Sequence, residues 1–291
     1  MRPFLRRITL VLALGVIGFV AVSAFFAYRF TSATSRPAGD FAPFLPATTE
    51  SIRFVTADGL SLAGWFTPSG DNSRAAVLLH GNGSNRRQML ARAALLRAQG
   101  YAVLLYDARG HGESAGDRVS IGWFETQDLL AALGYLRTRG ARQLGVLGCS
   151  QGGATIALAA DRLGPDVRWA VLESVYPTLR DAIDCRFRRT LFVPGWLGAL
   201  FMLPFAEWRL GVSADAIAPI DHVASFTCPV FLLHGEHDTH TLPASAQALF
   251  AHITAPKSLW LVPGASHNDL YGFAKATYEQ RLLDFIRAAP P

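Results

Sequence analysis

Hydrophobic and polar positions follow two alternating patterns from about residue 50 to the end of the chain. Short apolar runs bounded by Gly, Asn or Asp predict strands, and longer amphipathic runs predict helices. Glu50 to Thr56 and Leu60 to Thr67, separated by Asp58-Gly59, are typical of a β-hairpin. Strand and helix candidates then alternate, which predicts an α/β fold with a mostly parallel central sheet and helices on both faces. The expected strands cover residues 75–79, 101–106, 144–147, 169–172, 230–233 and 258–262, and the expected helices cover 86–98, 123–137, 154–162, 243–252 and 275–287.

The N-terminal segment departs from this pattern, because Ile8 to Tyr28 is an uncharged apolar run of 21 residues. A helix of about 20 apolar residues spans a bilayer, so residues 1–30 are expected to form a transmembrane anchor. Arg2, Arg6 and Arg7 precede the run. The positive-inside rule therefore places the N-terminus in the cytoplasm and the rest of the chain on the extracytoplasmic side. A cleaved signal peptide is the alternative, because Val22-Ser23-Ala24 resembles a cleavage site.

The remainder of the chain divides into a linker and one domain. Residues 31–46 are rich in Ser, Thr, Pro and Ala and predict a linker, and residues 47–291 predict the domain. One interval of the domain, about 175–226, is longer than an ordinary connection. Within it, Leu191 to Phe205 is strongly apolar, which predicts a short helical lid that binds substrate through Trp196 and Phe201. Ordinary helices packed on the sheet edge are the alternative.

Composition and charge narrow the classes of function. The chain has 291 residues, of which 51% are hydrophobic and 17% charged, so a large core is expected. The net charge of +5 is not gathered in one stripe, so no nucleic-acid partner is expected. A basic cluster at Arg186, Arg188 and Arg189 is interpreted as solvated or membrane-proximal charge. Three cysteines exclude complete pairing within the chain, and a Cys185–Cys228 disulfide is left open.

The segment Gly148 to Gly153 carries the most specific chemical signal. It reads G-x-S-x-G around Ser150 and directly follows the expected strand at 144–147. Glycines two positions before and after the serine allow the strand and the next helix to approach closely, and the serine is then exposed on a strained turn. The pattern therefore predicts that Ser150 is a nucleophile. A plain strand-turn-helix with a capping serine is the alternative.

A nucleophilic serine needs a base, an acid that orients it and an oxyanion hole. Asp238 follows the expected strand at 230–233, and His267 follows the last expected strand. The order Ser, Asp, His favours Asp238 as the acid and His267 as the base. The backbone N–H of Gln151, next to the nucleophile, and that of Asn82, in the loop after residues 75–79, are the expected oxyanion donors.

Two alternative assignments concern other residues at or near the ends of expected strands. Glu173 ends an earlier expected strand and is a rival for the acid. His234, His237 and His240 surround Asp238 and resemble a metal-binding cluster, but the zinc-protease pattern H-E-x-x-H is missing. We therefore expect no metal and no cofactor.

Five motifs, taken together, resemble the α/β-hydrolase superfamily of serine hydrolases over roughly residues 50 to 288. They are His80 to Gly83, Asp107 to Ser114, Gly148 to Gly153, His234 to Asp238 and Gly264 to Asp269. The anchor, the short lid and the ending G-A-S-H-N-D are similar to membrane-anchored α/β-hydrolase-domain proteins, which include depalmitoylases and S9/S33-peptidase-like members. The resemblance implies an α/β-hydrolase fold, Ser150 as nucleophile, Asp238 as acid and His267 as base. It also implies structural roles for Asp107, Arg109 and Ser114.

The leading hypothesis is a serine hydrolase that cleaves a carboxylic ester or thioester through an acyl-enzyme, with a small-molecule or acylated substrate. The apolar lid and the anchor favour medium or long acyl chains. An aminopeptidase-like amidase is the second hypothesis, and it needs an acidic group such as Asp181, Asp184 or Glu207 near the site. The third is a catalytically silent, membrane-tethered interaction protein.

Overall fold

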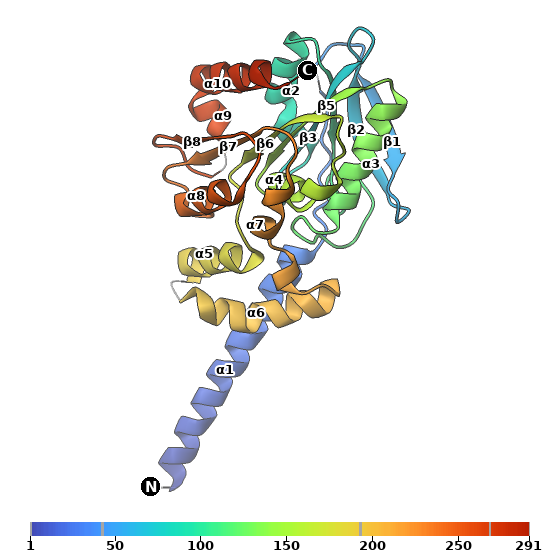
Figure 1. Ribbon diagram of the computed structural model, residues 1–291. Coiled ribbons are helices and arrows are strands. Elements are labelled where there is room, and N and C mark those ends of the chain that lie inside the picture. Colours follow the sequence, from blue (N-terminus) through green and yellow to red (C-terminus); the bar gives the residue numbers. More distant parts are fainter. Residues whose placement is uncertain (1, 42–43, 192–193, 268, 291) are drawn as a thin grey trace.

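The computed structural model describes residues 2–41, 44–191, 194–267 and 269–290. Asn268 of the G-A-S-H-N-D motif and residues 192–193 of the apolar lid run therefore lie outside the described residues. The alternating strands and helices build one eight-stranded sheet in the order β1-β2-β4-β3-β5-β6-β7-β8 (Figure 1). β1 and β2 form the expected antiparallel hairpin, β2 is also antiparallel to β4, and every other neighbouring pair is parallel. The strands are β1 (Glu50–Val55), β2 (Ser61–Thr67), β3 (Arg74–Leu79), β4 (Ala102–Tyr106), β5 (Gln143–Cys149), β6 (Val167–Glu173), β7 (Val230–Gly235) and β8 (Lys257–Val262).

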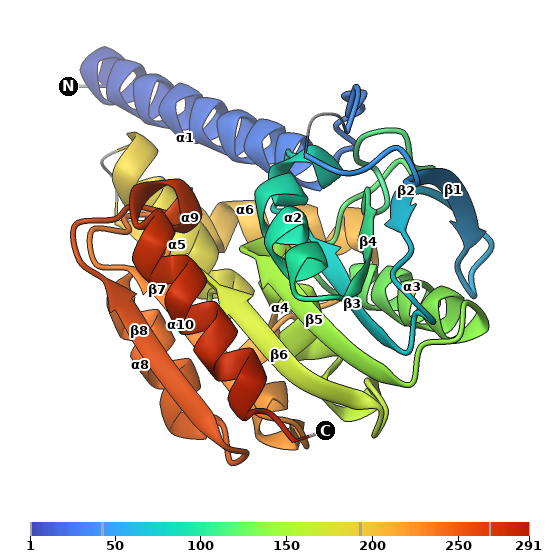
Figure 2. The same cartoon turned by 90° about the horizontal axis from the view of Figure 1, so that it is seen from above.

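Helices cover both faces of the sheet, as Figure 2 shows. α2 (Leu90–Ala98) and α10 (Lys275–Ala288) pack on one face, and α3 (Glu125–Thr138), α4 (Gln151–Leu158) and α8 (Pro243–His252) pack on the other. Side chains of β3 alternate between the two cores: Val77 faces one and Leu78 the other, and both are fully buried. A parallel strand buried on both faces has few polar side chains. The α/β-hydrolase fold predicted from the sequence is confirmed.

Two helix starts differ from the sequence prediction. The helix after Ser150 begins at Gln151 and includes Gly152 and Gly153, whereas the expected one began at residue 154. Glycine has poor helix propensity, but close contacts leave no room for a larger side chain there. The helix expected at 86–98 opens with a 3-10 turn, Arg86–Met89, before α2 begins.

The interval predicted as a lid contains α5 (Leu179–Leu191), α6 (Gly195–Leu210), the short helix α7 (Pro219–His222) and two 3-10 turns. We call α5 and α6 the lid helices. In Figure 1 they lie beside the sheet domain, at the point where α1 (Arg2–Thr31) leaves it. Cys185, at the start of this interval, and Cys228, after it, are both free and buried, so the disulfide left open by the sequence is not formed.

α1 is long and apolar enough to cross a membrane over Pro3–Thr31. Its side chains are exposed through Gly18 and become partly buried from Phe19 onward, where the helix packs against α6. The rings of Phe19 and Phe201 meet edge to face at 5.3 Å. The C-terminal half of α1 is therefore part of the domain, while its N-terminal half extends away from it (Figure 1).

The segment expected to be a linker lies along the domain surface. Ser32 and Thr34 form bridges with Arg118 and His111, and the Thr34 N–H donates to the Gly110 carbonyl at 2.6 Å. Further along, the Asn85 side chain donates to the Arg36 carbonyl. Hydrogen bonds spaced in this way hold the segment against the domain, so α1 and the domain are joined without a free tether.

Candidate active site

Ser150 lies on a sharp turn between β5 and α4. Its backbone has φ 52° and ψ −113°, a left-handed conformation that is uncommon for a residue with a side chain. A Cβ atom on Gly152 would lie 2.5 Å from the Leu79 carbonyl oxygen, and one on Gly153 would lie 2.4 Å from Val175. The glycines therefore permit the close approach that the turn requires, and the turn presents the Ser150 hydroxyl at the carboxyl edge of the sheet.

A chain of hydrogen bonds joins the three residues predicted as a triad. The Ser150 Oγ lies 3.0 Å from His267 Nε2, and His267 Nδ1 lies 2.7 Å from Asp238 Oδ2. His267 follows β8 and Asp238 follows β7, so parallel strands bring them to the same sheet edge as Ser150. With Nδ1–H donating to the carboxylate, Nε2 is free to accept the Ser150 proton.

The Asp238 carboxylate is buried and receives several hydrogen bonds. Oδ1 accepts from the backbone N–H groups of His240 at 2.8 Å and Thr241 at 3.0 Å. Burial raises the pKa of this carboxyl. The hydrogen bonds from His267 and Thr241 together lower the pKa by a larger amount, so the net shift is downward. Asp238 is thus held as an anion beside the His267 ring.

Glu173, the rival acid, has different partners. Its two carboxylate oxygens accept from Arg92 Nε at 2.8 Å and from Arg92 Nη2 at 2.6 Å, and the Tyr278 hydroxyl donates to one of them. All three side chains are buried, and His267 Nδ1 is bonded to Asp238. The structure therefore favours Asp238 over Glu173 as the residue that orients the histidine.

The backbone groups predicted as oxyanion donors lie next to Ser150. Gln151 is the first residue of α4, so its N–H has no partner within the helix. Gly81 lies against the serine, because a Cβ atom on it would be 3.5 Å from the Ser150 Cβ. Asn82 follows Gly81, and its side chain lies 3.2 Å from His111 Nε2. The loop after β3 thus reaches the nucleophile, and the donor roles of Asn82 and Gln151 stay predictions.

The buried His80 ring holds the loop after β3 in place through two hydrogen bonds. Its Nδ1–H donates to the Gly81 carbonyl at 2.8 Å, and its Nε2 accepts from the Ala108 N–H at 3.0 Å. The second bond needs the neutral ring, because Nε2 accepts a hydrogen bond only when it carries no proton. Burial, and then the neighbouring His111, lower the pKa of His80 from its usual 6.5 to about 3.

The shift at His80 predicts an acid-sensitive fold. Between pH 6.5 and about 3 the unfolded chain takes up a proton that the folded chain does not, so stability is complete above pH 6.5 and falls as the pH drops through that window. Thermal unfolding measured from pH 7.5 to 4.5 should show a declining midpoint, and a His80→Asn variant should show a shallower decline. Equal slopes for the two proteins would contradict this role of His80.

The histidines around Asp238 do not all gather in one place. His237 is exposed, and His234 is buried with Nε2 2.8 Å from the Thr241 carbonyl oxygen. The ligand atoms of Asp238, His240 and His267 lie within 4.8 Å of one another and could hold a cation. Two of those atoms already form the Asp238–His267 hydrogen bond, so an ion there would compete with the serine–histidine arrangement.

The two lid residues predicted to bind substrate do not line the cavity between the lid helices and α1, and their role in binding stays a prediction. Trp196 is 63% exposed, and Phe201 packs against Phe19 of α1. The cavity has a volume of about 120 Å³ and lies between α1, α5 and α6, and its lining includes neither residue. Its lining comprises Phe26, Phe30, Ile183, Arg186, Phe187, Arg189 and Met202. The sequence signals part of this lining through the basic cluster on α5, for which it predicts solvated or membrane-proximal charge.

The sheet order and the residues at its carboxyl edge give this protein the fold of an α/β-hydrolase. The family model described as "Serine aminopeptidase, S33" matches residues 70–201, which is less than half of the chain. The Escherichia coli protein YfhR is 28% identical over 258 residues, which cover 84% of this chain and 82% of its own. The lysophosphatidylserine lipase ABHD12 of Danio rerio is 28% identical over 79% of this chain and 62% of its own. The Pyrococcus furiosus esterase Pf2001 superposes with a TM-score of 0.73 at 22% identity, covering 89% of this chain and 99% of that one.

Proposed function

We propose that this protein is a serine hydrolase that cleaves carboxylic esters or thioesters through an acyl-enzyme intermediate. The observation that carries the proposal is the hydrogen-bonded chain from Ser150 through His267 to Asp238. Such a chain has a nucleophile, a base within reach of its proton and an anion that fixes the base's tautomer. A silent interaction protein has no need of all three in this geometry.

The proposed reaction has two halves. His267 Nε2 takes the Ser150 proton while Oγ attacks the carbonyl carbon, and the N–H groups of Asn82 and Gln151 stabilise the resulting oxyanion. The imidazolium then protonates the leaving alcohol or thiol, and the acyl group remains on Ser150. Water, deprotonated by His267, attacks the acyl-serine and releases the acid. Asp238 stays ionised throughout and stabilises the imidazolium.

The amidase alternative has one observation in its favour, the name of the matching family model. An aminopeptidase needs a carboxylate to hold the free amine of its substrate. The acids on α5 have other partners, because Asp184 pairs with Arg188 at 2.7 Å and Asp181 bonds Thr178. An esterase needs no such group, and the similar protein of Danio rerio is a lysophosphatidylserine lipase.

A fluorophosphonate probe tests the proposal directly, because it reacts with activated serines. Wild-type protein should be labelled and should hydrolyse p-nitrophenyl esters, and a Ser150→Ala variant should do neither. Specificity, as kcat/KM, should rise with chain length by roughly 0.8 kcal/mol per buried methylene before it levels off. Absence of both labelling and turnover in folded protein would leave the silent interaction protein as the better reading.

We also propose that residues 1–30 anchor the chain, that 31–46 join the anchor to the hydrolase domain at 47–291, and that this domain lies outside the cytoplasm. The apolar run, Arg2, Arg6 and Arg7 support this orientation. Packing of α1 on α6 begins at Phe19, which precedes the segment Val22-Ser23-Ala24 that resembles a cleavage site. This packing favours an uncleaved helix.

The anchor predicts a simple fractionation result. The expressed protein should stay in the membrane pellet after a high-salt wash, and protease should spare the domain in sealed vesicles whose cytoplasmic side faces out. Release of a soluble form that begins near Phe25 would instead indicate a cleaved signal peptide.

A further inference from the structure

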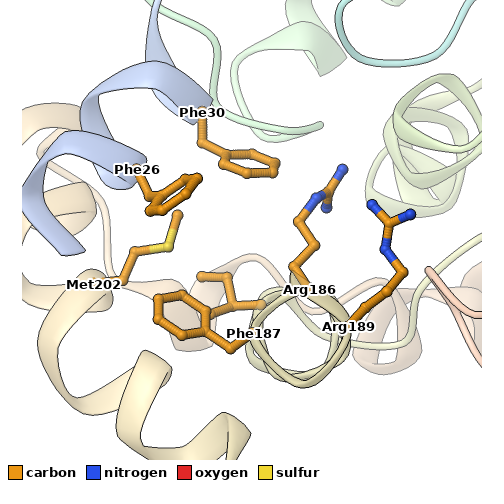
Figure 3. Close-up of a pocket in the computed structure, with 7 residues that line it drawn as sticks. Phe26, Phe30, Arg186, Phe187, Arg189 and Met202 are labelled. Atoms are coloured by element: carbon orange, nitrogen blue, oxygen red, sulfur yellow. The ribbon is translucent and has the colours of Figure 1, made fainter. Parts of the chain in front are cut away.

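The cavity between α1, α5 and α6 has two chemically different sides, as Figure 3 shows. Phe26 and Phe30 from α1, Phe187 from α5 and Met202 from α6 line the apolar side. Arg186 and Arg189 project from α5 on the other side (Figure 3). A lining that is half hydrocarbon and half guanidinium suits a ligand with an apolar chain and an anionic group.

The two arginines differ from the other arginines of the same helix. Arg180 pairs with Asp215 at 2.7 Å, and Arg188 pairs with Asp184 at 2.7 Å. Among the described residues, no carboxylate lies within ion-pair distance of Arg186 or Arg189; the Arg186 guanidinium stacks 4.1 Å from the Phe30 ring. Burial, and then Arg189, lower the pKa of Arg186 to about 10. A half-buried cation beside a second cation lacks the anion that would offset its desolvation.

The helix α5, which carries both arginines, lies near the catalytic histidine, because Cys185 on α5 hydrogen-bonds the backbone of Leu242, two residues after His240. The His240 ring is 4.8 Å from the His267 ring. The pKa of His240 is lowered to about 4, first by burial and His267 and then by Arg189 and Arg186. The two guanidinium groups are thus within electrostatic reach of a residue that touches the triad.

The proposed anchor places the lid helix α6 at the depth of the membrane. Eleven residues of the apolar run, Ile8 to Gly18, extend beyond the domain, which corresponds to about 16 Å of helix. A hydrocarbon core is about 30 Å thick, so the rest of the span must run beside α6. α6 exposes a matching apolar stripe at every fourth residue, formed by Trp196, Leu200, Pro204 and Trp208. Tryptophans at both ends of such a stripe are typical of a helix at the membrane interface.

We propose that this cavity receives the substrate of Ser150 laterally from the outer part of the bilayer, and that the substrate is a single-chain amphiphile with an anionic headgroup. The hydrocarbon chain lies against Phe26, Phe187 and Met202, and Arg186 and Arg189 bind the phosphate or carboxylate. This inference rests on the proposed hydrolase function, whose substrate class it names. The membrane helix then forms one wall of the substrate site.

The kinetic test compares two esters with the same acyl chain in the same detergent, lysophosphatidylglycerol and monoacylglycerol. Wild-type enzyme should prefer the anionic ester by about tenfold or more in kcat/KM, because two charge-assisted contacts are available only to it. The double variant Arg186→Gln, Arg189→Gln should bring the ratio close to one, and Arg186→Lys, Arg189→Lys should keep part of the preference. Arg188→Gln, on the same helix but paired with Asp184, should leave the ratio unchanged. A wild-type ratio near one, or equal losses on both esters, would overturn the proposal.

A binding test separates this inference from the proposed reaction. Full-length Ser150→Ala protein cannot turn over, so its affinity for lysophosphatidylglycerol, palmitate and monoacylglycerol is measured by titration. Tighter binding of an anionic ligand that is lost in the double glutamine variant supports the cavity, even if wild-type protein hydrolyses nothing. Preference for lysophosphatidylglycerol over palmitate assigns the anion as phosphate, and the reverse assigns it as carboxylate. Equal affinity for all three ligands would overturn the anionic site whatever the hydrolase activity.

Discussion

Ser150→Ala and His267→Ala should each lower kcat by about three to six orders of magnitude while the fold stays intact. The serine supplies the atom that forms the acyl-enzyme, and the histidine is the base 3.0 Å from it. Either loss removes covalent catalysis and leaves only binding and the oxyanion donors. Turnover of a p-nitrophenyl ester, with unfolding midpoints as the check on folding, measures the effect.

Asp238→Asn should cost somewhat less than the loss of either partner, because the base survives without its anionic partner. Ser266→Ala, next to His267 in sequence, is the matched control and should stay within a few-fold of wild type. Ser150→Ala and His267→Ala should combine non-additively, so the variant that carries both changes should be no slower than the worse single variant. Near-full activity of Asp238→Asn would remove Asp238 from the triad.

Glu173→Gln should destabilise the protein by about 3–5 kcal/mol, because it leaves the Arg92 guanidinium buried without its anion. Both side chains are almost completely buried, and Arg92 Nε donates to Glu173 at 2.8 Å. Thermal unfolding measures the loss. The double variant Arg92→Met, Glu173→Gln should recover part of it, because neither charge then remains.

A matched control for this ion pair lies at the surface. Glu50 and Arg139 also form a short pair, at 2.7 Å, but both are partly exposed, so Glu50→Gln should cost less than about 1 kcal/mol. Glu173→Gln protein that folds with wild-type stability but has lost activity would identify Glu173 as the acid after all.

The strands were predictable because the signal that defines them is local. Residues 75–79 and 230–233 are apolar without interruption, which is typical of a strand buried on both faces. Ser150, Asp238 and His267 could be placed at one sheet edge for the same reason, since each follows a predicted parallel strand.

The lid and the membrane helix were not predictable to the same extent. Trp196 and Phe201 are large and apolar, which makes them candidates for substrate contacts, but sequence does not reveal which side of α6 faces α1. The contact between Phe19 and Phe201 joins residues far apart in the chain. Arg186 and Arg189 look like ordinary surface charge until the fold brings Phe30 against them.

The hydrogen bonds that hold residues 32–36 to the domain have a practical consequence for anyone who shortens this chain. A soluble version that begins at residue 47 keeps Ser150, Asp238 and His267 but loses Phe26 and Phe30, and with them one wall of the cavity. On the proposed function, such a protein would still cleave small, water-soluble esters, so assays with those esters would not reveal the missing wall. Its selectivity among substrates would be lower, because that side of the cavity would be open to solvent. The shortened form would therefore not identify the natural substrate. Substrates should be screened with the full chain in nanodiscs or proteoliposomes.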